Sequence, residues 1–130
     1  MVSTTKSVFM IKLNDKLYTC PIDVSLSFVS GKWKILILSH LFQFDKKGFS
    51  EIKENLPGIS EKMLSQQLKQ LEKDDLISKA TLSLKPHRVE YSLTEKGRSL
   101  SPLFSFLSNW GITFLKNNAI DYMKDQYLYK

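Results

Sequence analysis

The spacing of apolar and polar positions changes along the middle of the chain. Across residues 49–74, apolar side chains recur at helical spacing, with a break at Pro57-Gly58. Across residues 77–93, two runs alternate apolar and polar at period two, as strands with one covered face do. The pattern therefore predicts two helices joined by a tight turn, followed by a two-stranded hairpin.

The second of these helices has two unlike faces. Ser60 is placed to cap its start by accepting a hydrogen bond from a free backbone N–H of the first turn. Leu64, Leu68 and Leu71 form one apolar stripe. The outer face has no acidic residue and is rich in hydrogen-bond donors: Lys62, Ser65, Gln66 and Lys69. Such a pair of helices indicates a DNA-binding helix-turn-helix, and the alternative is an ordinary amphipathic helix with a solvated face.

The predicted hairpin carries donor groups at its tip. Lys85, His87 and Arg88 surround Pro86, which has no backbone N–H to offer a neighbouring strand. A hairpin directly after a recognition helix is typical of the wing of a winged helix. We expect its tip to lie against the sugar-phosphate backbone or the minor groove, the alternative being a mobile charged loop.

The N-terminal third is predicted to be an arm followed by a helix. Residues 1–19 form the arm, with a short strand at Val8–Leu13. Pro21 fits the first position of a helix, where its missing N–H costs nothing, and that helix ends near Ser30. Its predicted inner face holds three apolar residues: Ile22, Leu26 and Val29.

A central helix is predicted from Lys32 to about Phe42, because this segment is apolar on nearly all sides. Trp33 is expected to belong to the core, and Lys32 is a weak candidate for a phosphate contact at the start of the helix. Residues 45–48 are expected to be a loop.

One long helix is predicted to begin at Thr94, and the segment 94–128 is predicted to hold the C-terminal dimerisation helices. Its apolar surface is wider than one neighbour usually covers. We expect the excess to form a dimer face, unless the core alone uses it. The residues expected in that face are Leu103, Phe106, Leu107, Trp110 and Phe114.

Composition narrows the class of protein. At 130 residues the chain is long enough for one domain, 1–130, with a real core. A net charge of +6 favours a polyanionic partner or serves as a solubility margin. The sequence offers no run of apolar residues long enough for a membrane span, no secretory signal, no glycine-rich phosphate loop and no metal-ligand spacing. We therefore expect a cytoplasmic protein that is not an enzyme and has no metal or cofactor.

The ordered motifs resemble the HxlR-type subfamily of winged-helix, MarR-like transcriptional regulators. They span residues 20–110 and are, in order, Cys20-Pro21, Gly31-Lys32-Trp33-Lys34, Phe49-Ser50-Glu51-Ile52, Leu56-Pro57-Gly58-Ile59-Ser60, Leu64, Leu68, Leu71-Glu72, Arg88-Val89-Glu90-Tyr91-Ser92-Leu93-Thr94, Gly97 and Trp110. The resemblance implies a helix-rich α+β fold, a winged helix-turn-helix with a two-stranded β-wing and N- and C-terminal dimerisation helices. It also implies a homodimer that binds double-stranded operator DNA, often as a repressor.

Two positions depart from the family pattern. Asp75 follows the recognition helix where such sequences usually have glycine, and aspartate tolerates the left-handed conformation better than most residues. Cys20 has no second cysteine in the chain, so an intramolecular disulfide is impossible.

Cys20 has two competing interpretations. The family resemblance implies a redox or electrophile sensor that responds to a small reactive effector. Backbone N–H groups at a helix start lower a thiol pKa, whereas Asp23 and apolar surroundings raise it. The alternative is a small buried core residue. For the whole chain, the alternative to an operator-binding regulator is a winged-helix module for protein interaction or dimerisation, without sequence-specific DNA binding.

Overall fold

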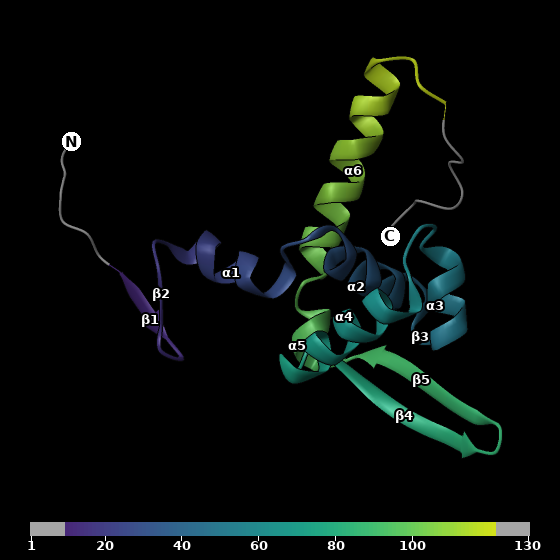
Figure 1. Cartoon of the computed structure of the whole chain (residues 1–130). Coiled ribbons are helices and arrows are strands. Elements are labelled where there is room, and N and C mark those ends of the chain that lie inside the picture. The colour runs from purple at the N-terminus through teal and green to yellow at the C-terminus, as the bar shows by residue number, and fades with distance from the viewer. Residues whose placement is uncertain (1–9, 122–130) are drawn as a thin grey trace, which may run out of the picture.

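Helices and a small antiparallel sheet share the core in the computed structural model, which describes residues 10–121 (Figure 1). The elements of this part of the chain are, in order, β1 (Ile11–Leu13), β2 (Lys16–Tyr18), α1 (Pro21–Val29), α2 (Lys32–Phe44), β3 (Lys46–Gly48), α3 (Phe49–Asn55), α4 (Glu61–Lys73), β4 (Ile77–Leu84), β5 (His87–Leu93), α5 (Glu95–Arg98) and α6 (Ser101–Asn117). This is the helix-rich α+β winged-helix arrangement that the sequence predicted. Within residues 10–121, no helix combines the length and the hydropathy that crossing a bilayer requires.

The central helix α2 is buried as predicted, and it extends two residues farther than expected, to Phe44. Its fully buried side chains are Ile37, Leu38 and Leu41. Phe104 of α6 packs on Phe42 of α2 with ring centroids 5.5 Å apart. The core therefore joins α2, α4 and the first half of α6, and it supports the helix pair α3–α4 from behind.

The sheet has three strands in the order β3-β5-β4. Strands β4 and β5 form the predicted hairpin, pairing from Ile77↔Leu93 to Leu84↔His87. The predicted loop at residues 45–48 was wrong, because Lys46–Gly48 pair with β5 as strand β3. This strand has no alternation of its own. It forms because Asp45, at φ 69°, turns the chain back along the free edge of β5.

The N-terminal arm contains a hairpin of which the sequence indicated one strand. Strand β1 begins at Ile11, whereas Val8 and Phe9 lie outside the described residues. Its partner β2 was not predicted, because three residues carry too short a pattern. The turn between them places Asn14 and Asp15 at φ 51° and 63°, the pair of left-handed residues that tight hairpins favour.

Helix α1 starts at Pro21 as predicted, but its inner face was assigned wrongly. Ile22 is 71% exposed and Leu26 is 49% exposed, so of the three predicted residues Val29 alone is buried. The reason is the course of the helix: α1 leads away from the core and joins it at its C-terminal end (Figure 1).

The prediction of one long helix from Thr94 was also wrong. The Thr94 hydroxyl does cap a helix, accepting from the backbone N–H of Gly97 at 3.0 Å, but α5 has four residues. A new helix, α6, begins at Ser101 with Pro102 in its first turn, where proline is favoured. It ends at Asn117, and the predicted continuation through residues 122–128 lies outside the described residues.

Candidate nucleic-acid interface

Helix α4 presents a free polar face because its opposite face is anchored in the core. The Ser60 hydroxyl accepts from the backbone N–H of Met63 at 3.0 Å, which is the predicted N-cap. The leucine stripe, Leu64, Leu68 and Leu71, is buried. On the outer side, Lys62, Gln66 and Lys69 are exposed and Ser65 is half-buried. The helix can therefore offer three long donor side chains to a partner without disturbing the core.

The C-terminal end of α4 is closed by two backbone hydrogen bonds. The N–H of Leu76 donates to the carbonyl of Leu71 at 3.0 Å, and the N–H of Asp75 donates to the carbonyl of Glu72 at 2.9 Å. This is the Schellman arrangement, which requires a left-handed residue at Asp75. Asp75 has φ 59°, so aspartate adopts here the conformation for which glycine is usual.

The same turn is joined to the start of α5, and we name this contact the α4–α5 joint. It consists of residues 74–76 and 94–97. The Thr94 N–H donates to the carbonyl of Leu76 at 3.1 Å, and the Thr94 hydroxyl donates to the carbonyl of Asp75 at 2.6 Å. The Lys96 ammonium donates to the carbonyl of Asp74 at 2.9 Å. The joint fixes the end of α4 relative to the helices that follow the wing.

Gly97 occupies the tightest point of the α4–α5 joint. It is buried, and a Cβ built on it would overlap the backbone carbonyl oxygen of Leu76. A backbone atom inside a hydrogen-bonded turn cannot move aside as a flexible side chain would. Gly97 belongs to the family motif, and packing accounts for it because no larger residue fits at this point of the joint.

The predicted donor side chains of the wing are exposed to solvent. Lys85, His87 and Arg88 are all exposed at or beside the turn between β4 and β5. The hairpin projects from the helical part of the molecule (Figure 1). Its tip can therefore contact a large partner that also lies on α4.

A polar cleft of about 480 Å³ lies between the wing, the start of α3 and α4. Its lining brings Ser65 of α4 together with His87 and Arg88 of the wing, whereas Lys62, Lys69 and Lys85 do not line it. Two carboxylates, Glu51 and Glu90, line it too. Its floor is therefore of mixed charge.

Glu51 is committed to the local structure of this cleft. Its carboxylate accepts from the backbone N–H of Gly48 at 3.1 Å and lies 3.6 Å from the Lys47 ammonium. The backbone N–H of Gly48, followed by the charge of Lys47, holds the pKa of Glu51 below its usual value. Glu51 therefore stays charged while it closes the first turn of α3.

Lys79 is a basic residue of the cleft that the sequence analysis did not select. It lies on β4 opposite Tyr91 of β5 and is exposed. In the sequence it was one of several polar residues in an alternating run. Its place in the lining of the cleft depends on the register of the wing, and the local pattern does not contain that register.

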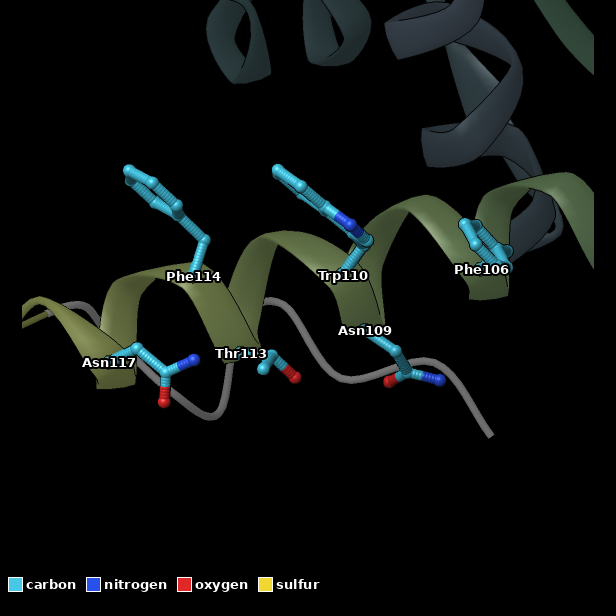
Figure 2. Close-up of a pocket in the computed structure, with 6 residues that line it drawn as sticks. All are labelled: Phe106, Asn109, Trp110, Thr113, Phe114 and Asn117. Carbon is cyan, nitrogen blue, oxygen red and sulfur yellow. The ribbon is translucent and has the colours of Figure 1, made fainter.

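The predicted dimer residues all lie on α6, and Figure 2 shows three of them, Phe106, Trp110 and Phe114, along one side of this helix. Phe106, Leu107, Trp110 and Phe114 are exposed, whereas Leu103 is half-buried and packs against the core. We name Phe106, Trp110 and Phe114 the aromatic face of α6. The rings of Trp110 and Phe114 are stacked with centroids 6.0 Å apart, and a shallow hollow of about 390 Å³ runs along them.

Cys20 is the N-cap residue of α1 and is half-buried. The backbone N–H of Asp23 lowers the pKa of its thiol, and the Thr19 hydroxyl adds to this effect. Burial and the Asp23 carboxylate act in the opposite direction but are outweighed. The Asp23 carboxylate also accepts from the N–H of Thr19 at 2.9 Å, which links the residue before the thiol to the first turn of α1.

The sequence is similar to a family of helix-turn-helix proteins and to individual regulatory proteins. Residues 28–119 match the family described as HxlR-like helix-turn-helix. Regulatory protein MalR of Fusobacterium mortiferum is 45% identical over 103 residues, which cover 78% of this chain and 97% of that protein.

Two solved structures share both the sequence and the fold. The crystal structure of the HTH-type transcriptional regulator YtcD, a protein of Bacillus subtilis, superposes with a TM-score of 0.69 at 40% identity. The match covers 75% of this chain and 98% of that one. The redox regulator HypR in its oxidized form superposes with a TM-score of 0.67 at 38% identity, covering 72% of this chain and 96% of that one.

Proposed function

The chain belongs to the HxlR-like helix-turn-helix family of transcriptional regulators, and on this basis we propose that it is a homodimeric repressor of a palindromic operator, relieved by an oxidant or electrophile at Cys20. Membership makes the chain a DNA-binding regulator of transcription, not an enzyme. The observation that carries the proposal is the exposed donor face of α4, anchored by its buried leucine stripe beside a basic wing.

The proposal divides the interface into two kinds of contact. Gln66 and the lysines Lys62 and Lys69 of α4 contact base edges in the major groove, because a carboxamide pairs with adenine and an ammonium with guanine acceptors. Ser60 and Ser65 add hydroxyl contacts at the edge of the same face. Lys85, His87 and Arg88 hold the wing on the phosphates, which positions the protein without selecting a sequence. The net charge of +6 supports this electrostatic part.

The proposed homodimer is supported by the apolar surface that the described chain leaves uncovered. The aromatic face of α6 and Leu107 place four exposed large apolar side chains on one helix, and exposed apolar patches of this kind often mark an interaction site. A two-fold axis would present two copies of α4 to one side of the duplex, about 34 Å apart. The half-sites are then inverted repeats about one helical turn apart, on DNA in the cytoplasm.

Substitutions in α4 and in the wing should separate readout from positioning. Gln66→Ala should cost about 1–3 kcal/mol on operator DNA and far less on random duplex, because it removes a base-edge contact. Arg88→Ala should weaken binding to both DNAs alike and reduce the log-log salt slope by about one unit. Fluorescence anisotropy over a salt series measures both quantities. Equal losses on both DNAs for both variants would overturn this division of roles.

A protein-interaction module is the second candidate function, favoured by the mixed charge of the cleft between wing and helices. The salt series also decides between the two. A DNA-binding dimer shows a slope of about 0.9 per neutralised phosphate. A module with a merely solubilising charge binds duplex weakly at every salt concentration.

The sensor role proposed for Cys20 rests on its lowered pKa and on its position at the start of α1. HypR, one of the structural neighbours, is itself named a redox regulator. Since this chain has one cysteine, its modified form is an adduct, an oxidised sulfur, a mixed disulfide or a bridge between two copies of Cys20. Each adds bulk or charge where α1 begins, and two reading helices about 34 Å apart leave little tolerance for a rotation.

Cys20→Ser should bind operator DNA normally but lose the response to a reactive effector. A quinone, an aldehyde or a peroxide should release the unsubstituted protein from DNA, and mass spectrometry should locate the modification on Cys20. The matched serine keeps the size and the N-cap position while removing the nucleophile. If the serine variant is released equally well, the effector acts elsewhere and Cys20 has no sensor role.

A further inference from the structure

Lys96 contacts two helices besides its own helix, α5. Its ammonium donates to the backbone carbonyl of Asp74, the C-cap residue of α4, at 2.9 Å. The same ammonium lies over the ring of Phe28 in α1, 4.6 Å from the ring centroid. One charged group therefore touches both the helix that carries the proposed base contacts and the helix that begins beside Cys20. We name Phe28, Lys96 and Asp74 the Lys96 bridge.

Both contacts of the bridge depend on the charge of Lys96. The carbonyl of Asp74 lies at the C-terminal end of α4, where the aligned backbone dipoles leave partial negative charge. The face of a phenylalanine ring is also negative, and it attracts a cation that lies within about 6 Å of its centroid. An uncharged side chain of similar length keeps the packing of the stem but loses both attractions.

The backbone of Lys96 is held firmly against the end of α4. The Thr94 hydroxyl ties α5 to the carbonyl of Asp75, and Gly97 is buried in the α4–α5 joint. The side chain of Lys96 extends from this fixed point to the ring of Phe28. It therefore links the joint to a helix that the joint itself does not contain.

Helix α1 is attached to the core at its C-terminal end. Val29 is its buried residue, and Phe28 beside it packs partly against the core. Cys20 lies at the opposite end, about 12 Å away at the usual helical rise. A group added at Cys20 therefore acts on α1 far from its attachment, and the Phe28 ring turns with the helix.

We propose that Lys96 is a positioning residue that couples α1 to α4. A displacement of α1 moves the Phe28 ring from under the ammonium, Lys96 shifts, and the carbonyl at the end of α4 loses its donor. Because the attraction requires the ring face below the cation, a rotation of α1 weakens it while the buried core stays intact. The coupling rests on the proposed function, which supplies the input at Cys20 and the output at operator DNA.

Operator affinity measured before and after alkylation of Cys20 tests the coupling. The probe is N-ethylmaleimide, and mass spectrometry verifies one adduct per chain. In the unsubstituted protein, alkylation should lower the affinity by about tenfold, within the usual range of allosteric coupling. Lys96→Met should lower the affinity of the unmodified protein roughly two- to fivefold, as expected for the loss of an exposed cation–π contact. Alkylation of this variant should then add no more than about a twofold loss.

The ratio of the two affinities separates coupling from a merely structural role, which would leave the ratio unchanged. Arg98→Met is the matched control, because it removes one positive charge from the same short helix. Arg98 pairs with Asp45 at 3.0 Å and is not part of the Lys96 bridge. This variant should respond fully to alkylation. Lys96→Arg should also respond, because a guanidinium donates to carbonyls and stacks on aromatic rings.

A double-mutant cycle tests the bridge without any modification of Cys20. Phe28→Leu keeps an apolar side chain in α1 but removes the aromatic face, and it is combined with Lys96→Met. The affinity lost in the double variant should be smaller than the product of the two single losses, by about twofold or more. Urea midpoints verify that each variant is folded under the conditions of the binding assay.

Independent losses in the cycle would overturn the proposal. An alkylation response as large in Lys96→Met as in the unsubstituted protein would overturn it too, while leaving Cys20 as the sensor. Loss of the response in Arg98→Met would contradict the assignment to Lys96, because any charge removed from α5 would then suffice. If alkylation fails to release the unsubstituted protein, the sensor role is refuted, and the cycle decides whether Lys96 couples α1 to α4.

Discussion

Gly97→Ala should destabilise the protein by about 3 kcal/mol, the upper end of the cost of overpacking. In an ordinary helix this change stabilises by about 0.5–1 kcal/mol, because alanine is the better helix former. Here the new Cβ would overlap the carbonyl of Leu76, which already accepts the N–H of Thr94 at 3.1 Å. Gly97→Ala should therefore destabilise the protein where the same change usually stabilises a helix. The α4–α5 joint has to open to make room for the new methyl group. Urea denaturation at a fixed protein concentration measures the change.

Gly111→Ala is the matched control, because it makes the same substitution in α6. A Cβ at Gly111 meets no atom within 4 Å. This variant should be as stable as the unsubstituted protein or more stable, by up to about 1 kcal/mol. If both glycine variants shift the midpoint in the same direction, the steric explanation for Gly97 is wrong.

Leu68→Ala should lower the free energy of unfolding by about 2–5 kcal/mol, since it removes a side chain that is 1% exposed and leaves a cavity under α4. Leu82→Ala on the wing removes the same atoms from an exposed position and should cost less than about 1 kcal/mol. Thermal and urea unfolding of the pair measure the difference. A loss below about 0.5 kcal/mol for Leu68→Ala would show that the stripe does not anchor the helix.

Elements with a repeated pattern and a chemical boundary were predictable from the sequence. Helix α4 has a leucine stripe and a serine at its start, and the structure shows both the burial and the cap. The wing has two alternating runs around Pro86, and the structure pairs them. Even the left-handed Asp75 could be predicted, because a helix end in this position needs such a residue.

The elements that were missed are determined by distant partners. Strand β3 exists because β5, more than forty residues away, offers a free edge. The break between α5 and α6 follows from the α4–α5 joint, which holds α5 against the turn after α4. Periodicity showed that Ile22 and Leu26 share a face with Val29, but it could not show whether the chain itself covers that face. Lys79 lines the cleft because of the way β4 pairs with β5, and the local sequence pattern does not contain that pairing.

The α4–α5 joint holds α4 in position without using the side chains that α4 presents to a partner. Its contacts end on the backbone carbonyls of Asp74, Asp75 and Leu76, and none of them uses the outward side chains of α4. Gene duplicates could therefore exchange Lys62, Gln66 and Lys69 and acquire a new operator while the angle between α4 and α6 stays the same. A scaffold of this kind lets sequence preference diverge in a lineage without rebuilding the support of the helix that carries it.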